Sequence, residues 1–453
     1  MPSNATTKPA LRRTLTLWDL IIYGIVLVQP TAPMPLFGIV YDKAGGHVVT
    51  AVMIAMTAML LTAVSYGRMA RAYPSAGSAF TYVGKELHPS LGFVTGWSMA
   101  MDYVMNPIIC TIWCAQAVVN DRLLRGVLPQ MPAWVWVIFF ALLFTTLNLR
   151  GIETSARVTK IMASAMGAVV LIFLVAAAKY LLANGPAVES YTQPFYDPNT
   201  FRLPLVLTGT SLAALTYMGF DGISTLSEEV QNPRRNIMLA TVLTCLITGL
   251  LSSIEVYAAQ VVWPAGKPFE NVETAYPFVA EFIAGPWLFS LVNLTLLVAS
   301  IGSGMGGQLA SARLLYGMGR GNAIPQKFFG AIDPKRSIPR NNVLFTGALV
   351  LAGGLTLTYD FGAQMVNFGA FIGFMGVNAA AIRHYYFRAE HKHFLTQFLP
   401  PALGFAVCLL IWLNLETPAK LWGGSWMLAG VLYGAWRTGW FRKNLASFES
   451  PAE

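Results

Sequence analysis

The residues of this sequence that could bind or exchange a charged group are acidic and aromatic side chains inside long apolar segments. Asp221 lies in one such segment, next to Phe220 and Gly219. Asp102 and Tyr103 lie together in another. Acidic residues in apolar segments of membrane length are rare and mark functional sites, because a carboxylate there can neutralise an amine or take up a proton. A hydrogen-bonded strut inside a helix bundle is the structural alternative for both acids.

A cluster of prolines interrupts the first apolar segment. Pro30, Pro33 and Pro35 fall within six residues at its middle. Each proline lacks a backbone N–H and clashes with the carbonyl four residues before it, so three together predict an unwound helix. Carbonyls released inside a membrane need partners from the protein, water or a ligand. We therefore expect this break to line a substrate site through Thr31, Ala32 and Met34.

The composition indicates an all-α membrane protein. The chain has 453 residues, of which 55% are hydrophobic and 11% charged, whereas soluble domains have about 25% charged residues. The apolar segments are long enough to cross a hydrocarbon core of about 30 Å. We predict twelve spans, at residues 18–40, 47–70, 92–119, 133–149, 159–182, 204–226, 237–262, 277–312, 341–358, 362–383, 398–415 and 420–437.

The basic residues predict the orientation of these spans. With a cytoplasmic amino terminus, 23 of the 30 Lys and Arg residues fall in inner loops, as the positive-inside rule requires. Both termini are then cytoplasmic, and a bacterial-type inner membrane is expected. The net charge of +9 therefore reflects topology and not nucleic-acid binding. Residues 1–16 lack a cleavable signal pattern.

A second helix break is expected in the sixth span, where Gly219 and Gly222 flank Asp221. Close helix packing is the alternative for a glycine pair, but the acid favours a break. Spans one and six are five apart, so a five-span repeat has to be inverted relative to its twin. The predicted parts are a leader at 1–17, repeats at 18–182 and 204–383, two further helices at 398–437, and a cytoplasmic tail at 438–453.

Three motifs resemble the amino acid–polyamine–organocation (APC) superfamily. They are residues 65–82 after span two, residues 219–229 with Asn232-Pro233, and residues 311–320 leading to Pro325 and Pro339. The resemblance covers nearly the whole chain and implies the LeuT-like fold, with an inverted five-plus-five repeat, two extra helices, and discontinuous helices 1 and 6. Within the superfamily the chain resembles bacterial putrescine importers.

Two departures from common family patterns bear on the substrate and its coupling. Amino acid permeases often have a Gly-Ser-Gly-like first break whose N–H groups bind a carboxylate, whereas this chain has Thr31-Ala-Pro-Met34. A cationic substrate is therefore favoured. Proton-coupled relatives have a lysine midway along the fifth helix, where this chain has Met166; Lys160 lies nearer the cytoplasmic end.

Further polar and aromatic residues are candidates with structural alternatives. Glu255 could attract cations or accept a proton, or could lie at the outer interface. Ser300 and Ser303 match the region that supplies sodium ligands in relatives, although small residues also serve helix packing. Tyr217 and Phe368 could close over an amine. Glu228 and Glu229 could pair with Arg71 or Arg157 at an inner gate, or remain solvated.

These observations predict a secondary active transporter for a small organic cation, with putrescine or another polyamine favoured. The alternatives are an amino acid permease or exchanger and, from another class, a channel or transporter-like receptor. No metal-ligand spacing, nucleophile–base pattern or phosphate loop supports an enzyme or a cofactor. The expected partners are a small-molecule substrate, a coupling proton or sodium ion, and the lipid bilayer. Homo-oligomer formation is left open.

Overall fold

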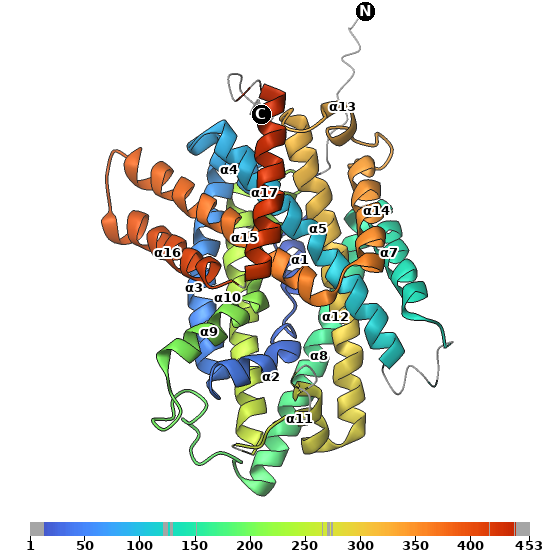
Figure 1. Cartoon of the computed structure of the whole chain (residues 1–453), viewed down its shortest axis with the longest axis vertical. Helices are drawn as coiled ribbons and strands as arrows, with labels where there is room; N and C mark the ends of the chain where they lie inside the picture. Colours follow the sequence, from blue (N-terminus) through green and yellow to red (C-terminus); the bar gives the residue numbers. More distant parts are fainter. Residues whose placement is uncertain are drawn as a thin grey trace, which may run out of the picture.

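The computed structural model describes residues 13–120, 126, 130–150, 152–264, 266–269, 272, 275–415, 417–438 and 440. These residues form a helical bundle (Figure 1) in which the β pairings are two isolated bridges, Leu15 with Val230 and Asp333 with Ile338. Most of the predicted leader and tail lies outside the described residues. So do six of the basic residues used to predict the orientation: Lys8, Arg12, Arg122, Arg125, Arg442 and Lys443.

The helices follow one another along the chain with short connections. They are α1 (Leu17–Val28), α2 (Pro33–Lys43), α3 (Val48–Ala72), α4 (Ser78–Glu86), α5 (Pro89–Asn120), α7 (Ala133–Leu149), α8 (Ile152–Asn184), α9 (Leu203–Ala213), η1 (Ala214–Tyr217), η2 (Phe220–Leu226), α10 (Pro233–Val262), α11 (Ala275–Ala284), α12 (Pro286–Arg320), α13 (Gln326–Phe329), α14 (Arg340–Thr356), α15 (Tyr359–Ile382), η4 (Arg383–Phe387), η5 (Phe394–Phe398), α16 (Leu399–Leu413) and α17 (Thr417–Thr438).

Every predicted span falls on one of these helices or on consecutive helices. Within the described residues, nine spans are long and apolar enough to cross a membrane when α1 and α2 count as one broken span. The remaining predicted spans fall on α7 and α14, with 17 residues each, and on α17, which has 22 residues but is less apolar. A multi-span membrane protein is thus confirmed, and the count of twelve stays a prediction.

The boundary predicted for the eighth span is wrong. Residues 277–312 were expected to form one helix, but α11 ends at Ala284 and α12 begins at Pro286. Gly285 between them has φ 89°, which ends α11, and proline is well suited to the first turn of the next helix. The short helix expected near residues 80–87 is present as α4.

The first span is interrupted where the prolines predicted it. α1 ends at Val28, the next residue Gln29 has φ 64°, and α2 begins at Pro33 with its axis bent by 49° from α1. Proline at the start of α2 costs no hydrogen bond, because the first N–H groups of a helix have no partner within it. Ala32 donates to the Gln29 carbonyl at 2.9 Å, so the connecting residues form a tight turn.

The sixth span is interrupted at Gly219. The α-helix ends at Ala213 and continues as one 3₁₀ turn, η1. Met218 is then extended and Gly219 adopts φ 112°, before the chain re-enters a 3₁₀ helix at Phe220. Glycine is required at this position because other residues are strained in that region. The predicted second break is therefore present.

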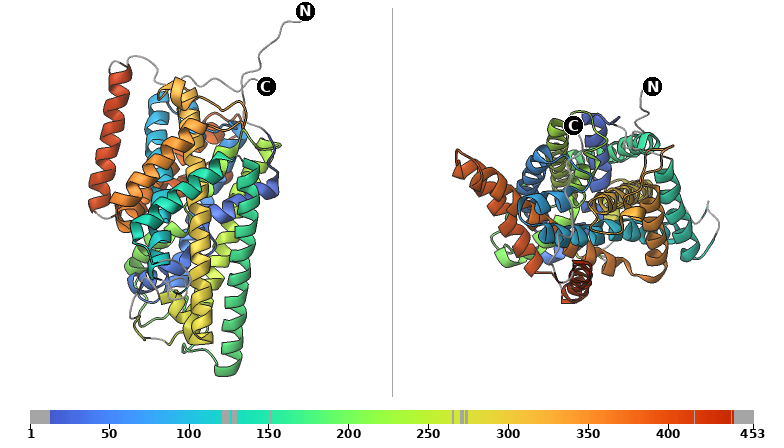
Figure 2. Two further views of the ribbon diagram at one scale, coloured as in Figure 1. Left: turned by 90° about the vertical axis from the view of Figure 1, so that its right-hand side faces the viewer. Right: turned by 90° about the horizontal axis from the view of Figure 1, so that it is seen from above.

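The two interrupted spans lie within the bundle. α1 and η2 both contact α10 and α12, and α3 packs along α10. α4 and α13 lie at one end of the molecule, and α2, α9 and α11 lie towards the other (Figure 1). α16 and α17 lie at the periphery (Figure 2), so the helices added after the predicted repeats cover the bundle without entering its centre.

A methyl group at position 219 tests the second break. The Cβ of Gly219→Ala would lie 3.0 Å from Leu27 Cγ, in a strained backbone region. We expect the free energy of unfolding to fall by about 1–3 kcal/mol, measured as a lower thermal midpoint of the detergent-purified protein. Gly167→Ala in α8 is the matched control, since nothing lies within 4 Å of its added Cβ. Equal midpoints for the two variants would contradict the strained break.

Candidate substrate site

The centre of the candidate site is the pair formed by Tyr103 and Asp221. The Tyr103 hydroxyl of α5 donates a short hydrogen bond to Asp221 Oδ2 of η2. Both residues are buried. The N–H groups of Gly219 and Gly222 lie near this carboxylate, but its second oxygen, Oδ1, is buried and accepts no hydrogen bond of regular geometry from the described residues. A buried polar atom without a partner needs an explanation, and an amine donor from a substrate would satisfy it.

Asp102 and three aromatic residues complete this cluster. Asp102 is buried and interacts electrostatically with Asp221. Phe220 packs edge-on against Tyr66 of α3, with 5.7 Å between ring centroids, and at a tilt against Phe374 of α15, with 5.2 Å between centroids. Two acids held together in an apolar environment are costly unless a cation or protons neutralise them. The cluster therefore suits positive charge.

Tyr66 is a site residue that sequence reasoning missed. Its hydroxyl is fully buried without a hydrogen-bond partner among the described residues, and it interacts electrostatically with Asp221 and Asp102. Its position inside a family motif was a signal, but nothing in the sequence places α3 beside η2. Phe374 was missed for the same reason.

The two helix breaks meet next to this cluster. A Cβ at Gly219 would lie 3.4 Å from the Leu27 carbonyl carbon and oxygen, so the second break packs against the end of α1. Ser303 of α12 donates to the Leu27 carbonyl at 2.9 Å, and Ser252 of α10 donates to the Pro30 carbonyl at 3.4 Å. The protein itself thus satisfies carbonyls that the broken helix leaves unpaired.

Other residues of the first break are placed differently. Thr31 is fully buried and its hydroxyl has no partner among the described residues. Ala32 lines a small cavity of about 110 Å³ together with Asn106, Ser300 and Ser303. Asp221 is not among its lining residues. Met34 is fully buried in α2, and its N–H donates to the Thr31 carbonyl at 3.0 Å.

Two candidate aromatic residues do not join the cluster through the contacts described. The Tyr217 hydroxyl donates to the Val52 carbonyl of α3 at 3.0 Å. Phe368 packs against Trp412 at 5.4 Å and lies against Gly423 of α17. Phe368 thus contacts the peripheral helices, and its apolar cluster also includes Met101 of α5. The role assigned to each of these site residues remains a prediction.

Glu255 is fully buried in α10 and neither carboxylate oxygen has a hydrogen-bond partner among the described residues. It does not lie at an exposed interface, which was the alternative considered from the sequence. Tyr276 of α11, also fully buried, interacts electrostatically with it. Tyr276 in turn packs against Phe173 of α8 and Phe37 of α2. Glu255 therefore lies at the junction of the helices at the α11 end.

Ion pairs join helices at the opposite end, but not with the partners predicted. Arg313 of α12 binds both carboxylate oxygens of Glu229, and both side chains are buried. Arg320 binds Glu228, which also accepts from the Ala76 N–H at 2.9 Å. The candidate partners Arg71, on α3, and Arg157, on α8, do not form these pairs, and the alternative of solvated charge does not hold either, because α12 contacts η2 and supplies both arginines.

Met166 occupies the position at which proton-coupled relatives are expected to have a lysine. Met166 of α8 is fully buried and packs with Val26 and Ala299, so it contacts the end of α1 as an apolar side chain. Lys160 lies one and a half turns earlier and pairs with Asp19 at 2.6 Å, with 53% of its side chain exposed. Neither residue reaches the acidic cluster through the contacts described.

Two facing helix interruptions beside buried polar groups, inside a bundle of membrane-length helices, define a secondary transporter. The profile of the amino acid permease family matches residues 25–422. The chain therefore belongs to the amino acid permease family of the APC superfamily and has its LeuT-like fold, as its motifs predicted.

Known relatives align with the chain over almost its full length. It is 32% identical to the low-affinity putrescine importer PlaP of Escherichia coli strain K12, over 99% of this chain and 98% of that protein. It is 24% identical to the branched-chain amino acid permease BcaP of Lactococcus lactis, over 92% and 93%. It is 25% identical to the methylthioribose transporter of Bacillus subtilis, over 95% and 94%. Membrane transport of a small molecule is thus confirmed.

Removing the Tyr103 hydroxyl tests the acidic cluster. Tyr103→Phe removes the side-chain hydrogen bond to Asp221 Oδ2, and a bond to a charged group contributes about 1.5–3 kcal/mol. We expect a lower thermal midpoint that added substrate partly restores. Tyr217→Phe is the control, because it removes a bond to a backbone carbonyl outside the cluster. A midpoint unchanged by Tyr103→Phe would contradict the coupling between Tyr103 and Asp221.

Proposed function

We propose that this chain imports a small organic cation across the cytoplasmic membrane, with putrescine or a related diamine as its substrate. The observation that carries the proposal is the unpartnered Oδ1 of Asp221 in a buried cluster with Asp102. Two carboxylates match the two ammonium groups of a diamine in charge. The putrescine importer among the relatives supports the same substrate class.

The first break argues against recognition of a substrate carboxylate. Pro30, Pro33 and Pro35 have no N–H, and the N–H groups of Ala32 and Met34 already donate within the turn. An amino acid needs donors for its carboxylate, as offered by helix amino termini in other transporters. Transport or exchange of a neutral or cationic amino acid remains the alternative, since branched-chain amino acid permeases are also relatives.

We further propose how the fold moves the substrate. Residues 18–182 and 204–383 act as inverted repeats that rock about the two breaks, with residues 398–437 as additional helices. Both termini face the cytoplasm, so that α4 and α13 lie at the inner end and α11 at the outer end. The Glu229–Arg313 and Glu228–Arg320 pairs then hold the inner end closed. The proposed activity is transport without a chemical reaction on the substrate.

A proton is the coupling ion we favour, with Glu255 as its carrier. An ionised carboxylate without a partner is costly in an apolar site, so the packing around Glu255 favours the neutral acid. Movement of α2 and α11 away from α10 would admit water and permit proton release. Ser303 already donates to the Leu27 carbonyl, which gives it a structural role without a sodium ion; Ser300 is the other sodium-ligand candidate.

The substrate proposal is tested by uptake into proteoliposomes. Labelled putrescine is compared with alanine, arginine and glutamate, and we expect saturable putrescine uptake that competes with other diamines. Asp221→Asn should lower the apparent affinity at least about tenfold, equivalent to 1.4 kcal/mol, because the amide keeps the shape but loses the charge. The exposed acid Glu189 provides the control Glu189→Gln. Normal putrescine transport by folded Asp221→Asn would remove Asp221 from the site.

The coupling proposal is tested by separating exchange from accumulation. Glu255→Gln resembles the protonated acid and cannot release a proton, so we expect loss of pH-driven accumulation. Exchange of internal for external substrate should persist, because it needs no net proton movement. Glu281→Gln in α11 is a control acid of the same region. Accumulation by Glu255→Gln equal to wild type would exclude Glu255 as the proton carrier.

A further inference from the structure

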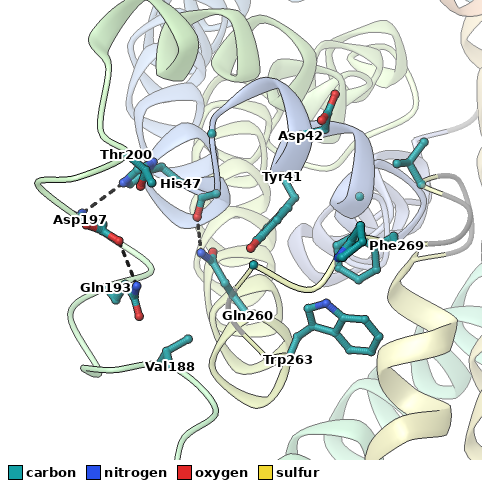
Figure 3. A pocket seen from close by; sticks show the side chains of 16 residues that line it. Tyr41, Asp42, His47, Val188, Gln193, Asp197, Thr200, Gln260, Trp263 and Phe269 are labelled. Atoms are coloured by element: carbon teal, nitrogen blue, oxygen red, sulfur yellow. Dashed lines mark hydrogen bonds between the residues drawn. The ribbon is translucent and has the colours of Figure 1, made fainter.

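A second and larger cavity lies at the α11 end of the molecule, apart from the acidic cluster. Its volume is about 410 Å³, within the range of about 300–1,000 Å³ usual for small-molecule sites. It is walled by the end of α2, the segment between α8 and α9, and the end of α10 (Figure 3). None of the residues predicted to bind substrate lines it.

On one side of this pocket, the N–H groups of a backbone turn donate to carbonyls of the same turn and are not available to a ligand. The Gly45 and Gly46 N–H groups donate to the Asp42 and Tyr41 carbonyls at 3.3 and 2.8 Å. His47 is 1% exposed and accepts from the Asp197 N–H through Nε2 at 3.1 Å. Its proton must therefore be on Nδ1, which lies 3.2 Å from the Ala44 carbonyl. These groups are therefore used locally.

The groups that remain for a ligand are acceptors. Gln260 of α10 is only 6% exposed, and its amide N–H donates to the Gly46 carbonyl. Its Oε1 is buried and has no hydrogen-bond partner among the described residues. Figure 3 shows this side chain among the lining residues, between Tyr41 and Val188. A buried amide oxygen without a partner calls for a donor from a ligand.

Two of the residues that line the pocket are acidic. They are Asp42 and Asp197, and the described lining residues include no Lys or Arg, although the Lys267 ammonium lies on the ring of Trp263 at the edge of the pocket. Asp197 accepts from Gln193 and from the Asn199 N–H, each at 2.9 Å. These two bonds hold the pKa of Asp197 below its ordinary value, so that the carboxylate is ionised at neutral pH.

The aromatic wall of the pocket already contacts an alkylammonium group. The Lys267 Nζ lies 4.9 Å from the Trp263 ring centroid and 5.6 Å from that of Phe282. Trp263 stacks on Phe269, which meets Tyr41 edge-on at 5.5 Å. Cations are attracted to such ring faces. The wall is therefore compatible with a primary ammonium and its methylene chain.

We propose that this pocket is a second binding site, which takes an aliphatic diamine before it reaches the central site. One ammonium group binds beside Asp197, the chain lies along Tyr41 and Phe269, and the second ammonium donates to Gln260 Oε1, while Asp42 adds negative charge to the lining. The diamine and the outward orientation of the pocket rest on the proposed function. The site itself rests on the cavity, its acceptors and its charge.

Binding stoichiometry in nanodiscs tests the second site, with labelled putrescine as the probe. Wild type should bind two molecules per chain, and the double variant Asp42→Asn, Asp197→Asn should bind one. The amides keep the size of the carboxylates but replace one acceptor oxygen by a donor, so Asp197→Asn loses one of two surface hydrogen bonds. A monodisperse elution profile and an unchanged thermal midpoint verify that the fold persists. Glu189→Gln, an exposed acid of the same segment as Asp197, should still bind two. Uptake at low substrate concentration should fall roughly threefold to tenfold, since charge raises local cation concentration.

The central and outer sites are separated by a second comparison. Asp221→Asn should retain one saturable site, and adding the two outer substitutions should abolish it. If the double variant still binds two molecules, or if wild type binds only one and Asp221→Asn removes it, the outer site is excluded while the proposed function stands. If putrescine binds, depends on Asp42 and Asp197, but is not transported, the outer site stands and the proposed function fails.

Discussion

A helix that is interrupted inside a membrane leaves backbone carbonyl and N–H groups that must be hydrogen-bonded, and the arrangement of the central helices follows from this requirement. α1 stops at Val28, and the carbonyls near its end are bonded by Ser303 and Ser252 from two other helices. The second break can approach α1 only because Gly219 has no side chain. These contacts fix α10, α12 and η2 around one point. The acidic cluster lies beside that point because Asp221 is two residues from Gly219.

The features that the sequence predicted are local ones. The effects of three prolines and of a Gly-Phe-Asp-Gly stretch can be predicted without knowing which helix packs beside them, because each acts on its own backbone. The contributions of Tyr66 and Phe374 were not visible, since they depend on which helix faces η2. The partners of Glu228 and Glu229 could not be read from the sequence for the same reason, because the register of α12 decides which arginines reach them. Gly285 was overlooked because apolar sequence continues on both sides of it.

Charge is distributed along the molecule in a way that fits cation transport. Acceptors line the large pocket at the α11 end, acids lie buried near the two breaks, and ion pairs join helices at the α4 end. The Glu229–Arg313 pair is buried, so separating its members without new partners costs several kcal/mol. Opening that end therefore requires α12 and the end of η2 to move together or exchange partners.

The most direct measurement is a structure of this protein with a diamine bound at the breaks. We predict an ammonium nitrogen about 2.7–2.9 Å from Asp221 Oδ1, which is the separation of a charge-assisted hydrogen bond. Tyr103 should keep its bond to Oδ2. A diamine bound between the breaks with both nitrogens directed away from Asp221 would show that this carboxylate does not bind the substrate.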